Sequence, residues 1–571
     1  MKTKITLLFL SIITLATAQN LTSPALEEAL KNPEEQINLD LSENDLSGLP
    51  TDFGKLSHLI SLNISANHFS FLPESFVELK ELSILNASFN KLSRLPNDIG
   101  RLNHLTVLSL NNNEFSSVPA SIAELDSLRE LNLGSNKLTE LPETFGNLKN
   151  LQELNLDNNK IKSLPKNFGS LRKLQRLDLR NNALNSLPKM EGLEQLTHLN
   201  LNGNPLGKLP KDLFTLDSLT DLRISRCELK SIPDKIKQLS ELIFLEAEGN
   251  DLSKLPNGIT ELFALTHLNV ENNHLTELPQ NIGNLSSLVM LNCKHNQIVI
   301  LPQSIGQLKE LKELYLAANG LVILPPEIGG LKSLGKLNLE DNFITDLPIT
   351  FGDLLQLEDL YLGGNQLTEL PDEFGKCNRL LRVDLSRNQL TKIPETIDGL
   401  TLLSKLNLRE NQLTDLPEEI GALTNLTELS INENQLEELP ETIGNLENLA
   451  TLSLDGNYLT KLPEEFGYLK NLQRLYLQGN QIKKLPKSFT QLKNLAYLNL
   501  DANNLKSLPK DISDLQNLYY LSLENNALKS MPESLGELTN LKTLLLGGNL
   551  FSGKEKARIR SLVPKDCVVR F

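Results

Sequence analysis

The feature that most constrains the fold is a repeat of 23 residues that runs through almost the whole chain of 571 residues. The segment around Asn388, RLLRVDLSRNQLTKIPETIDGL, can be slid along the sequence so that an asparagine recurs at the same place from Asn44 to Asn549. The series has 23 members; Cys227 replaces the asparagine in one of them, and the layer from Asn182 to Asn204 is one residue shorter. Such self-similarity is typical of solenoids, in which one small unit is copied and stacked.

Each repeat contains the parts of one coil. In LTELSINEN, Leu429 and Ile431 alternate with polar residues before Asn434, which predicts a short strand with one buried face. The Leu439–Pro440 step that follows stays extended, because the residue before proline avoids helix. Apolar residues then recur at spacings of four, three and three up to Leu449, which predicts one face of a short helix or 3-10 turn. We expect the asparagine amides to form a ladder of hydrogen bonds with the backbone of tight, buried turns.

No single coil could bury its apolar face alone, so the coils must stack. We expect their strands to form a parallel sheet on the inside of an arc, with the wider helical segments on the outside. At ~4.8 Å per layer, 23 layers give an inner surface on the order of 110 Å long.

The two ends of such a stack need covers. Ser23 and the PALEE segment after it predict a capped helix with proline at its first position, which places an N-terminal helical cap at 19–36. At the other end a basic amphipathic stretch, Gly553–Leu562, begins a C-terminal cap at 553–571. The repeats fill 37–552.

The segment Met1–Ala18 has the features of a signal peptide. Lys2 and Lys4 form a basic start, Ile5–Ala16 is apolar, and Ala16-Thr17-Ala18 supplies a small-x-small cleavage pattern. The apolar run is too short to span a bilayer comfortably, so the alternative is a buried first helix. We expect an exported protein, which is secreted, periplasmic or on the cell surface.

The charge balance disfavours two classes of partner. The chain has 56 basic and 71 acidic residues, a formal net charge of −15, and loss of the signal peptide would remove two more lysines. Nucleic acid and anionic membranes both attract basic surfaces, so we expect neither as a partner. No second apolar segment predicts insertion into a membrane.

The sequence contains no signature of catalysis or of a bound cofactor. The motifs GxxxxGK[ST], GxGxxG, HExxH, GxSxG and CxxC are absent. We therefore expect no enzyme and no cofactor. His267, His274 and His295 lie on neighbouring layers but at different offsets from the asparagine, so a metal site is not predicted.

The cysteines are predicted to be unpaired. Cys227, Cys293 and Cys377 lie about three or more layers apart, roughly 14 Å or more, and Cys567 lies many layers further on. A disulfide needs Cα atoms within about 7 Å. We expect the first three to pack as small apolar side chains.

The residues six, four, two and one before each asparagine are predicted to face the concave groove. Most are polar, so the aromatic and arginine exceptions are the best candidates for binding a partner. These ligand-binding candidates are Tyr315, Tyr361, Arg382, Arg387, Arg409, Tyr476, Tyr497 and Tyr520. A second, basic patch comprises Arg176, Arg180, Arg223 and Arg226. The alternative is that tyrosines are simply favoured on a sheet face.

The pattern LxxLxLxxNxLxxLPxxIGxLxx resembles the leucine-rich-repeat superfamily over essentially the whole chain beyond Ala18. It is most similar to the subclass with LPxxIG, which includes plant intracellular Ras-group proteins, animal Ras-pathway scaffolds and bacterial exported proteins. The two end segments look like the caps of Bacteroidetes-type bacterial members. The resemblance implies an α/β solenoid, a horseshoe with a concave parallel sheet, convex short helical or 3-10 segments and about 23 repeats. It also implies protein binding on the concave surface.

Three functions follow from these observations. The first is a non-catalytic scaffold, or a surface or periplasmic receptor, that recognises a protein partner on its concave face. The second is binding of a carbohydrate or cell-envelope polymer, with the tyrosines as stacking platforms for sugar rings. The third is a regulatory scaffold of a Ras-like signalling type, which applies if the segment Met1–Ala18 is not a signal peptide. The oligomeric state is left open.

Overall fold

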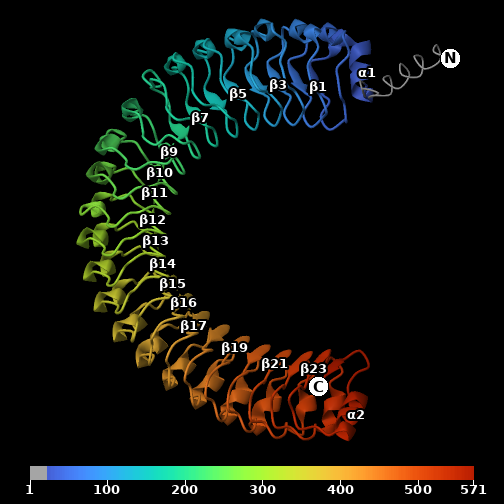
Figure 1. Cartoon of the computed structure of the whole chain (residues 1–571), viewed down its shortest axis with the longest axis vertical. Helices are drawn as coiled ribbons and strands as arrows, with labels where there is room; N and C mark the ends of the chain where they lie inside the picture. Colours follow the sequence, from blue (N-terminus) through green and yellow to red (C-terminus); the bar gives the residue numbers. More distant parts are fainter. Residues whose placement is uncertain (1–21) are drawn as a thin grey trace, which may run out of the picture. The chain divides into compact units, whose positions relative to one another are not determined.

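A computed structural model describes residues 22–571, so the predicted signal peptide lies outside the described residues. The chain divides into two compact units, one ending at Asn273 and the other formed by His274–Phe571. The repeat pattern continues across this boundary, and nothing in the sequence marks it. In both units the strands line the inner, concave side and the short helices lie on the outer side (Figure 1).

In the first unit consecutive strands pair in parallel, each offset by one repeat length from the strand before it. Each strand has three residues, and its middle side chain is buried. The strands are β1 Asn38–Asp40, β2 Ser61–Asn63, β3 Ile84–Asn86, β4 Val107–Ser109, β5 Glu130–Asn132, β6 Glu153–Asn155, β7 Arg176–Asp178, β8 His198–Asn200, β9 Asp221–Arg223, β10 Phe244–Glu246 and β11 His267–Asn269.

The second unit repeats this arrangement, again with parallel pairing between consecutive strands. Its strands are β12 Met290–Asn292, β13 Glu313–Tyr315, β14 Lys336–Asn338, β15 Asp359–Tyr361, β16 Arg382–Asp384, β17 Lys405–Asn407, β18 Glu428–Ser430, β19 Thr451–Ser453, β20 Arg474–Tyr476, β21 Tyr497–Asn499, β22 Tyr520–Ser522, β23 Thr543–Leu545 and β24 Val568–Arg570.

The helical segments of the repeats are 3-10 helices, as expected for turns this short. In the first unit they are Pro33–Glu35, Phe53–Lys55, Glu74–Glu78, Ile99–Arg101, Ala120–Glu124, Phe145–Asn147, Phe168–Ser170, Lys211–Thr215, Asp234–Gln238 and Asn257–Glu261. In the second unit they are Ile282–Asn284, Gln303–Gln307, Pro326–Gly330, Ile349–Asp353, Asp372–Lys376, Glu395–Gly399, Glu418–Ala422, Glu441–Asn445, Glu464–Tyr468, Lys487–Gln491, Ile512–Asp514 and Glu533–Glu537.

The predicted asparagine ladder is present and buried. In a typical layer, Asn159 Oδ1 accepts a hydrogen bond from Leu138 N at 2.9 Å, and Asn159 Nδ2 donates to the carbonyl oxygens of Leu133, Leu156 and Asp157 at 2.9 to 3.1 Å. These amides, called the buried ladder below, connect each turn to the preceding layer. They satisfy backbone groups that would otherwise be orphaned in the interior.

Cys227 takes the place of asparagine in the buried ladder. Its thiol lies 3.2 Å from the carbonyl oxygen of Leu201 and 3.4 Å from that of Ser225. Burial raises the pKa of the Cys227 thiol to about 11. All four cysteines are free, which confirms the prediction, and Cys293 and Cys377 are buried as predicted.

The core of each coil is filled by leucine, with stacked phenylalanines on the helical side in four places. The paired rings have centroids 6.1 to 6.5 Å apart and are nearly parallel. They are Phe53–Phe76, Phe145–Phe168, Phe351–Phe374 and Phe466–Phe489. Aromatic bulk is thus concentrated under the 3-10 helices, while aliphatic side chains, mostly leucine, fill the space under the strands.

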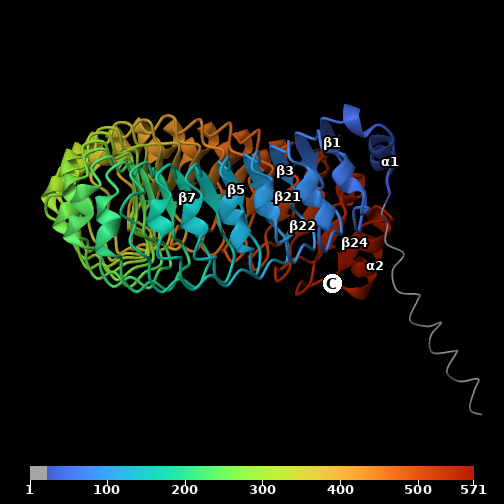
Figure 2. The ribbon, with the colours of Figure 1, turned by 90° about the horizontal axis from the view of Figure 1, so that it is seen from above.

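Helices occur at both ends of the repeats. Helix α1, Pro24–Lys31, is capped by Ser23, whose side chain accepts a hydrogen bond from Leu26 N. Helix α2, Gly553–Leu562, packs beside the last 3-10 helix, and β24 extends the sheet by one strand (Figure 2). Within residues 22–571 no helix has the length and apolar character needed to cross a membrane.

Candidate functional site

In strands β1 to β23 the middle residue is buried, and the two end residues of each strand face the concave surface. These are the positions six and four before the asparagine of the buried ladder. All eight predicted ligand-binding residues lie on this face or in the turn that follows the strand. Arg387 lies in that turn, with a positive φ of 53°.

The first two predicted tyrosines belong to an alternating row of rings and cations in the second unit. Lys294 Nζ lies 4.7 Å from the centroid of the Tyr315 ring. Lys336 Nζ lies between two rings, 5.5 Å from the centroid of Tyr315 and 5.7 Å from that of Tyr361. Arg382 occupies the next layer. We call Lys294, Tyr315, Lys336, Tyr361 and Arg382 the aromatic–cation row.

The two lysines of this row are held by rings and not by acids. Within residues 22–571 neither Lys294 nor Lys336 forms an ion pair. Their positive charges therefore remain available, since a ring attracts a cation without neutralising it. The Tyr315 hydroxyl donates to Glu313 at 2.7 Å; burial and this carboxylate raise the pKa of Tyr315, so its ring is neutral at physiological pH.

The three predicted arginines, in contrast, are each paired with a carboxylate. Arg382 donates twice to Asp359, at 2.7 and 3.0 Å. Arg387 reaches Asp341 at 3.0 Å, and Arg409 contacts its neighbour Glu410 at 2.8 Å. Tyr361 and Arg382 also line a hollow of about 240 Å³, together with Asp384, Lys405, Asn407, Glu428 and Ser430.

The remaining predicted tyrosines form a stack on consecutive layers. The rings of Tyr497 and Tyr520 are nearly parallel, with centroids 4.3 Å apart, and Tyr476 leans against Tyr497 at 5.0 Å. We call these three residues the tyrosine stack. Tyr497 and Tyr520 cover each other's facing surfaces, so a partner cannot stack between these two rings. Arg474, at the same strand position as Tyr497 one layer earlier, forms no ion pair within the described residues.

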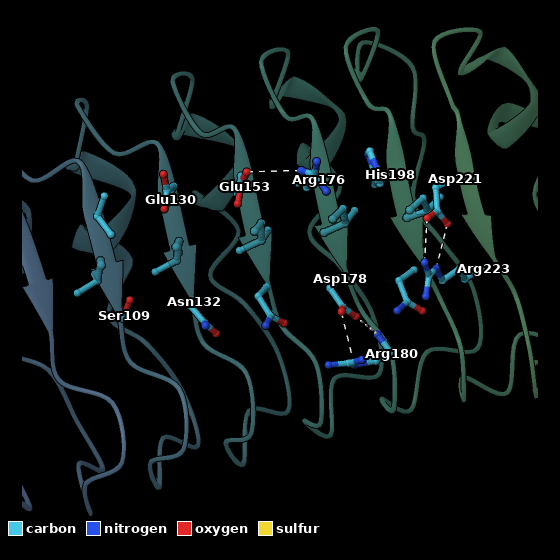
Figure 3. A pocket seen from close by; sticks show the side chains of 18 residues that line it. Ser109, Glu130, Asn132, Glu153, Arg176, Asp178, Arg180, His198, Asp221 and Arg223 are labelled. Carbon is cyan, nitrogen blue, oxygen red and sulfur yellow. Dashed lines mark hydrogen bonds and ion pairs between the residues drawn. The ribbon is translucent and has the colours of Figure 1, made fainter. Parts of the chain in front are cut away.

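The first unit contains a larger concave hollow, of about 440 Å³, that crosses strands β4 to β9 (Figure 3). Val107, Ser109 and the middle leucines of the strands form part of its lining, and the other side chains that line it are Glu130, Asn132, Glu153, Asn155, Arg176, Asp178, Arg180, His198, Asn200, Asp221 and Arg223. We call it the charged hollow. Within it, the first residue of the strand is an acid on β5 and β6, namely Glu130 and Glu153, and a base on β7, namely Arg176.

The charged hollow contains three residues of the predicted basic patch, and the prediction of a basic surface is wrong. Arg180 is bound by Asp157 at 2.9 Å, Arg223 by Asp221 at 3.0 Å, and Arg226 by Glu248 at 3.2 Å. Arg176 is the least constrained, 3.6 Å from Glu153. The acids that neutralise the patch lie in the same strand or in a neighbouring layer, so the surface is a mosaic of both charges.

Burial perturbs two titratable groups in the charged hollow. Desolvation raises the pKa of Asp178, although the Arg180 backbone N–H and guanidinium oppose this shift. Desolvation, reinforced by Arg176, lowers the pKa of His198, whose Nδ1 lies 2.9 Å from the Thr197 hydroxyl. Both shifts favour the neutral forms.

The amides in the charged hollow belong to a second row of asparagines, four residues before the buried ladder. Their Oδ1 atoms accept a hydrogen bond from the backbone N–H two residues later; Asn155, for example, accepts from Asp157 at 2.9 Å. We call the members in the first unit the surface amide row: Asn63, Asn86, Asn132, Asn155, Asn200 and Asn269.

Three members of the surface amide row line the charged hollow, namely Asn132, Asn155 and Asn200. Within the described residues the Nδ2 groups of these three donate no hydrogen bond. The hollow therefore contains amide donors that the fold itself does not use.

Some of these functional candidates escaped prediction. Lys294, Lys336 and the surface amide row were passed over as ordinary polar residues of the concave face. The signal that could have identified the lysines is that each lies one layer from a tyrosine, and for Asn132 and Asn155 it is that they lie one repeat length apart. In the described part of the chain, no group of three or more histidine, cysteine, aspartate or glutamate side chains could hold a metal ion.

Comparisons with known proteins agree with this geometry. The model of the leucine-rich repeat region matches residues 38–132, 86–156, 120–201, 257–348 and 451–546, more than half of the chain, and further leucine-rich-repeat models match 195–216, 356–413 and 401–459. The comparison with curated proteins gives no match.

Several solved structures are similar to the chain. A leucine-rich-repeat protein of Leptospira interrogans is 39% identical, with a TM-score of 0.53, over 64% of this chain and 99% of that protein. The plant peptide hormone receptor RGFR1, in complex with RGF2, is 32% identical with a TM-score of 0.72, over 90% of each chain. YopM from Yersinia enterocolitica is 25% identical with a TM-score of 0.57, over 91% of this chain and 93% of that one. The predicted solenoid class is confirmed, and the chain belongs to the leucine-rich-repeat family.

Proposed function

We propose that this protein is a non-catalytic recognition protein that binds a protein partner on the concave face of its strands. The observation that carries the proposal is the aromatic–cation row, in which Lys336 is held between the rings of Tyr315 and Tyr361 without a carboxylate partner among the described residues. Tyrosine and arginine dominate the energetics of protein interfaces. Both tyrosines are already ordered by their lysine neighbours, which reduces the entropy that binding would cost.

The tyrosine stack supports a protein partner more than a sugar. A sugar ring packs on the open face of an aromatic ring, but the facing surfaces of Tyr497 and Tyr520 lie against each other. The ring edges and phenol hydroxyls of the stack suit hydrogen bonds and edge contacts with a polypeptide. Carbohydrate binding therefore has less support as the main function.

Two relatives support a role in recognition. The plant receptor RGFR1 is described in complex with RGF2, and the Arabidopsis receptor kinase HAESA in complex with the peptide hormone IDA and the co-receptor SERK1. HAESA is 30% identical to this chain, and the match covers 96% of this chain. These ligands belong to those proteins, and we carry over only the use of the repeats for binding.

We also propose that the protein is exported and belongs to the bacterial LPxxIG subclass. The support comes from Lys2, Lys4 and the apolar run that follows, and from the LPxxIG motif in the repeats, as in Leu439–Gly444. A signal-peptide fusion to a reporter enzyme tests the first part. We expect the segment Met1–Ala18 to direct export of the reporter, and a reporter retained inside the cell would contradict it.

Affinity capture tests the main proposal. The chain is immobilised, proteins from the cell envelope and culture medium are captured, and the dissociation constant of a purified partner is measured. We expect Tyr315→Ala combined with Tyr361→Ala to weaken binding at least tenfold, because interface tyrosines commonly contribute more than about 1 kcal/mol each.

The matched control is Tyr458→Ala combined with Tyr468→Ala. These tyrosines lie off the concave strands and are well exposed, at 51% and 52%. We expect the control pair to bind normally. Equal affinities for the two double variants, both folded, would contradict the concave site.

A further inference from the structure

We propose that the charged hollow of the first unit binds an extended peptide segment that has a basic and an acidic side chain about three residues apart. This inference rests on the proposed function and names the kind of segment that the partner presents. The peptide would contact the Nδ2 groups of the surface amide row and the first residues of strands β5, β6 and β7.

The first support is a set of three unused donors, on β5, β6 and β8, with Asp178 at the same position on β7. Asn132, Asn155 and Asn200 line the charged hollow, and their Nδ2 groups donate no hydrogen bond within residues 22–571. Each Oδ1 is engaged by a backbone N–H, at 2.9 to 3.1 Å. With the oxygen fixed in this way, each of the three residues lines the hollow with an unused Nδ2 group; Asn132 is labelled in Figure 3.

A row of fixed donors selects a ligand with a row of acceptors. The main chain of an extended peptide has one carbonyl oxygen per residue and cannot satisfy all of them by itself. Since the amides are already oriented, they lose little conformational freedom when a ligand binds. An extended backbone is therefore a good match to the surface amide row.

The second support is the order of charges beside this row. Glu130 and Glu153 are the first residues of β5 and β6, and Arg176 is the first residue of β7. No ion pair of Glu130 is formed within the described residues, and Glu153 lies 3.6 Å from Arg176. A basic side chain fits beside the two glutamates and an acidic one beside Arg176, where electrostatic complementarity fixes the register of the segment.

The spacing of the charges in the ligand follows from the layers. Glu130 and Arg176 lie two layers apart, about 10 Å at ~4.8 Å per layer. An extended segment in the polyproline II conformation advances about 3.1 Å per residue with three residues per turn, so two charged side chains three residues apart lie on the same face, about 9 Å from each other.

The charges also distinguish a peptide from an envelope polymer. A polymer with many acidic sugars would meet Glu130 and Glu153, which repel it. A neutral polysaccharide would displace water from the guanidinium of Arg176 and from both carboxylates. It has no charges of its own to pair with these three groups. A polypeptide can supply both charges within one short segment.

Synthetic peptides test the proposal with the whole chain. The probe is an eight-residue peptide, acetylated and amidated, with Lys and Glu three positions apart in a Gly/Ser/Thr background; both orders of the two charges are used. Binding is measured by calorimetry at low salt. We expect at least one order to bind in the micromolar to millimolar range. Peptides with adjacent charges, or with Gln in place of Lys, should bind at least fivefold more weakly.

The decisive variant is Asn132→Asp combined with Asn155→Asp. Aspartate can keep the bond to the backbone, as Asp178 does from the same strand position, accepting from Arg180 N at 3.0 Å. The substitution replaces each Nδ2 donor by an acceptor, so peptide binding should weaken at least tenfold. The matched control is Asn86→Asp combined with Asn269→Asp, which makes the same change in the surface amide row outside the hollow and should alter binding less than twofold.

The outcomes separate the two proposals. If the peptides fail to bind the wild-type chain at millimolar concentration, or bind both double variants equally, the peptide proposal is overturned. If neutral oligosaccharides bind and are lost in Asn132→Asp with Asn155→Asp, the hollow is a glycan site and the peptide proposal is again overturned. If a captured protein partner binds the Asn132→Asp, Asn155→Asp double variant normally but loses affinity with Tyr315→Ala and Tyr361→Ala, only the peptide proposal fails and the proposed function stands.

Discussion

Asn155 and Asn159 lie in the same coil and have the same carboxamide, yet their surroundings differ completely. Asn159 is 8% exposed and uses both its oxygen and its nitrogen in hydrogen bonds to backbone groups. Among the described residues Asn155 uses only its oxygen in hydrogen bonds, and it lines the charged hollow. The buried amide holds layers together and the surface amide is available for binding. Register within the coil, and not residue type, decides between folding and recognition.

The largest expected effect is on the buried side of this comparison. Asn159→Ala should lower the free energy of unfolding of the first unit by on the order of 3 kcal/mol, because it leaves Leu138 N and three carbonyl oxygens without this partner in the interior, where an orphaned group is costly. Urea denaturation followed by circular dichroism measures the change.

Asn155→Asp is the control within the same coil, since the aspartate oxygen can accept the same bond from Asp157 N. It should shift the unfolding midpoint little compared with Asn159→Ala. Similar losses in the two variants would refute the distinction between the buried ladder and the surface amide row.

Cys227 provides an intermediate test. Its thiol is a weak donor to two carbonyl oxygens, where Asn159 makes four hydrogen bonds. Cys227→Ala should therefore cost only about 1 kcal/mol, mostly from the small cavity that remains. The same denaturation experiment measures it. A loss as large as that of Asn159→Ala would mean that packing, and not hydrogen bonding, explains the stability of the ladder.

Asp178→Asn should give the smallest effect and one that depends on pH. Burial raises the pKa of Asp178 in the folded state, so folding favours the protonated form. Stability from this group is present below the unfolded pKa and is lost as pH rises through the folded pKa. The asparagine variant should thus be slightly more stable than wild type at pH 7, within about 0.5 kcal/mol, and no more stable near pH 3. Thermal melts at both pH values test this. A gain that is larger at pH 3 would contradict the sign.

Most of the fold follows from the sequence because the residues of each repeat specify where its strand, turn and 3-10 helix begin. The alternation of Leu429 and Ile431, the asparagine that follows and the Leu-Pro step specify strand, buried turn and 3-10 helix in every coil of this type. The pairing of strands needs no long-range inference, because consecutive coils are neighbours. The division at Asn273 could not be predicted, since the same repeat lies on both sides of it.

The candidate site was predictable in its position and less so in its chemistry. The concave location of Tyr315 and Tyr497 follows from the offset alone. Charge pairing does not, because it depends on which way each side chain turns: Arg382 is neutralised by Asp359, whereas Lys336, in register with Glu313 and Asp359, lies against two tyrosines. A search for acids in the same strand and in the neighbouring layers would have corrected the basic patch. The unused Nδ2 groups required the direction of each amide, which no sequence pattern contains.

The bonds of the buried ladder have a consequence for how such a chain can change over generations. Asn159 forms hydrogen bonds with residues 21 and 26 positions earlier. Asn182 forms the same bonds in the next coil, and nearly all the remaining layers have them too. Duplicating or deleting one whole coil would therefore restore every such bond with an equivalent one. Recombination can therefore change the number of repeats at little energetic cost. The recognition surface would become longer or shorter, while the contacts between neighbouring coils stay the same.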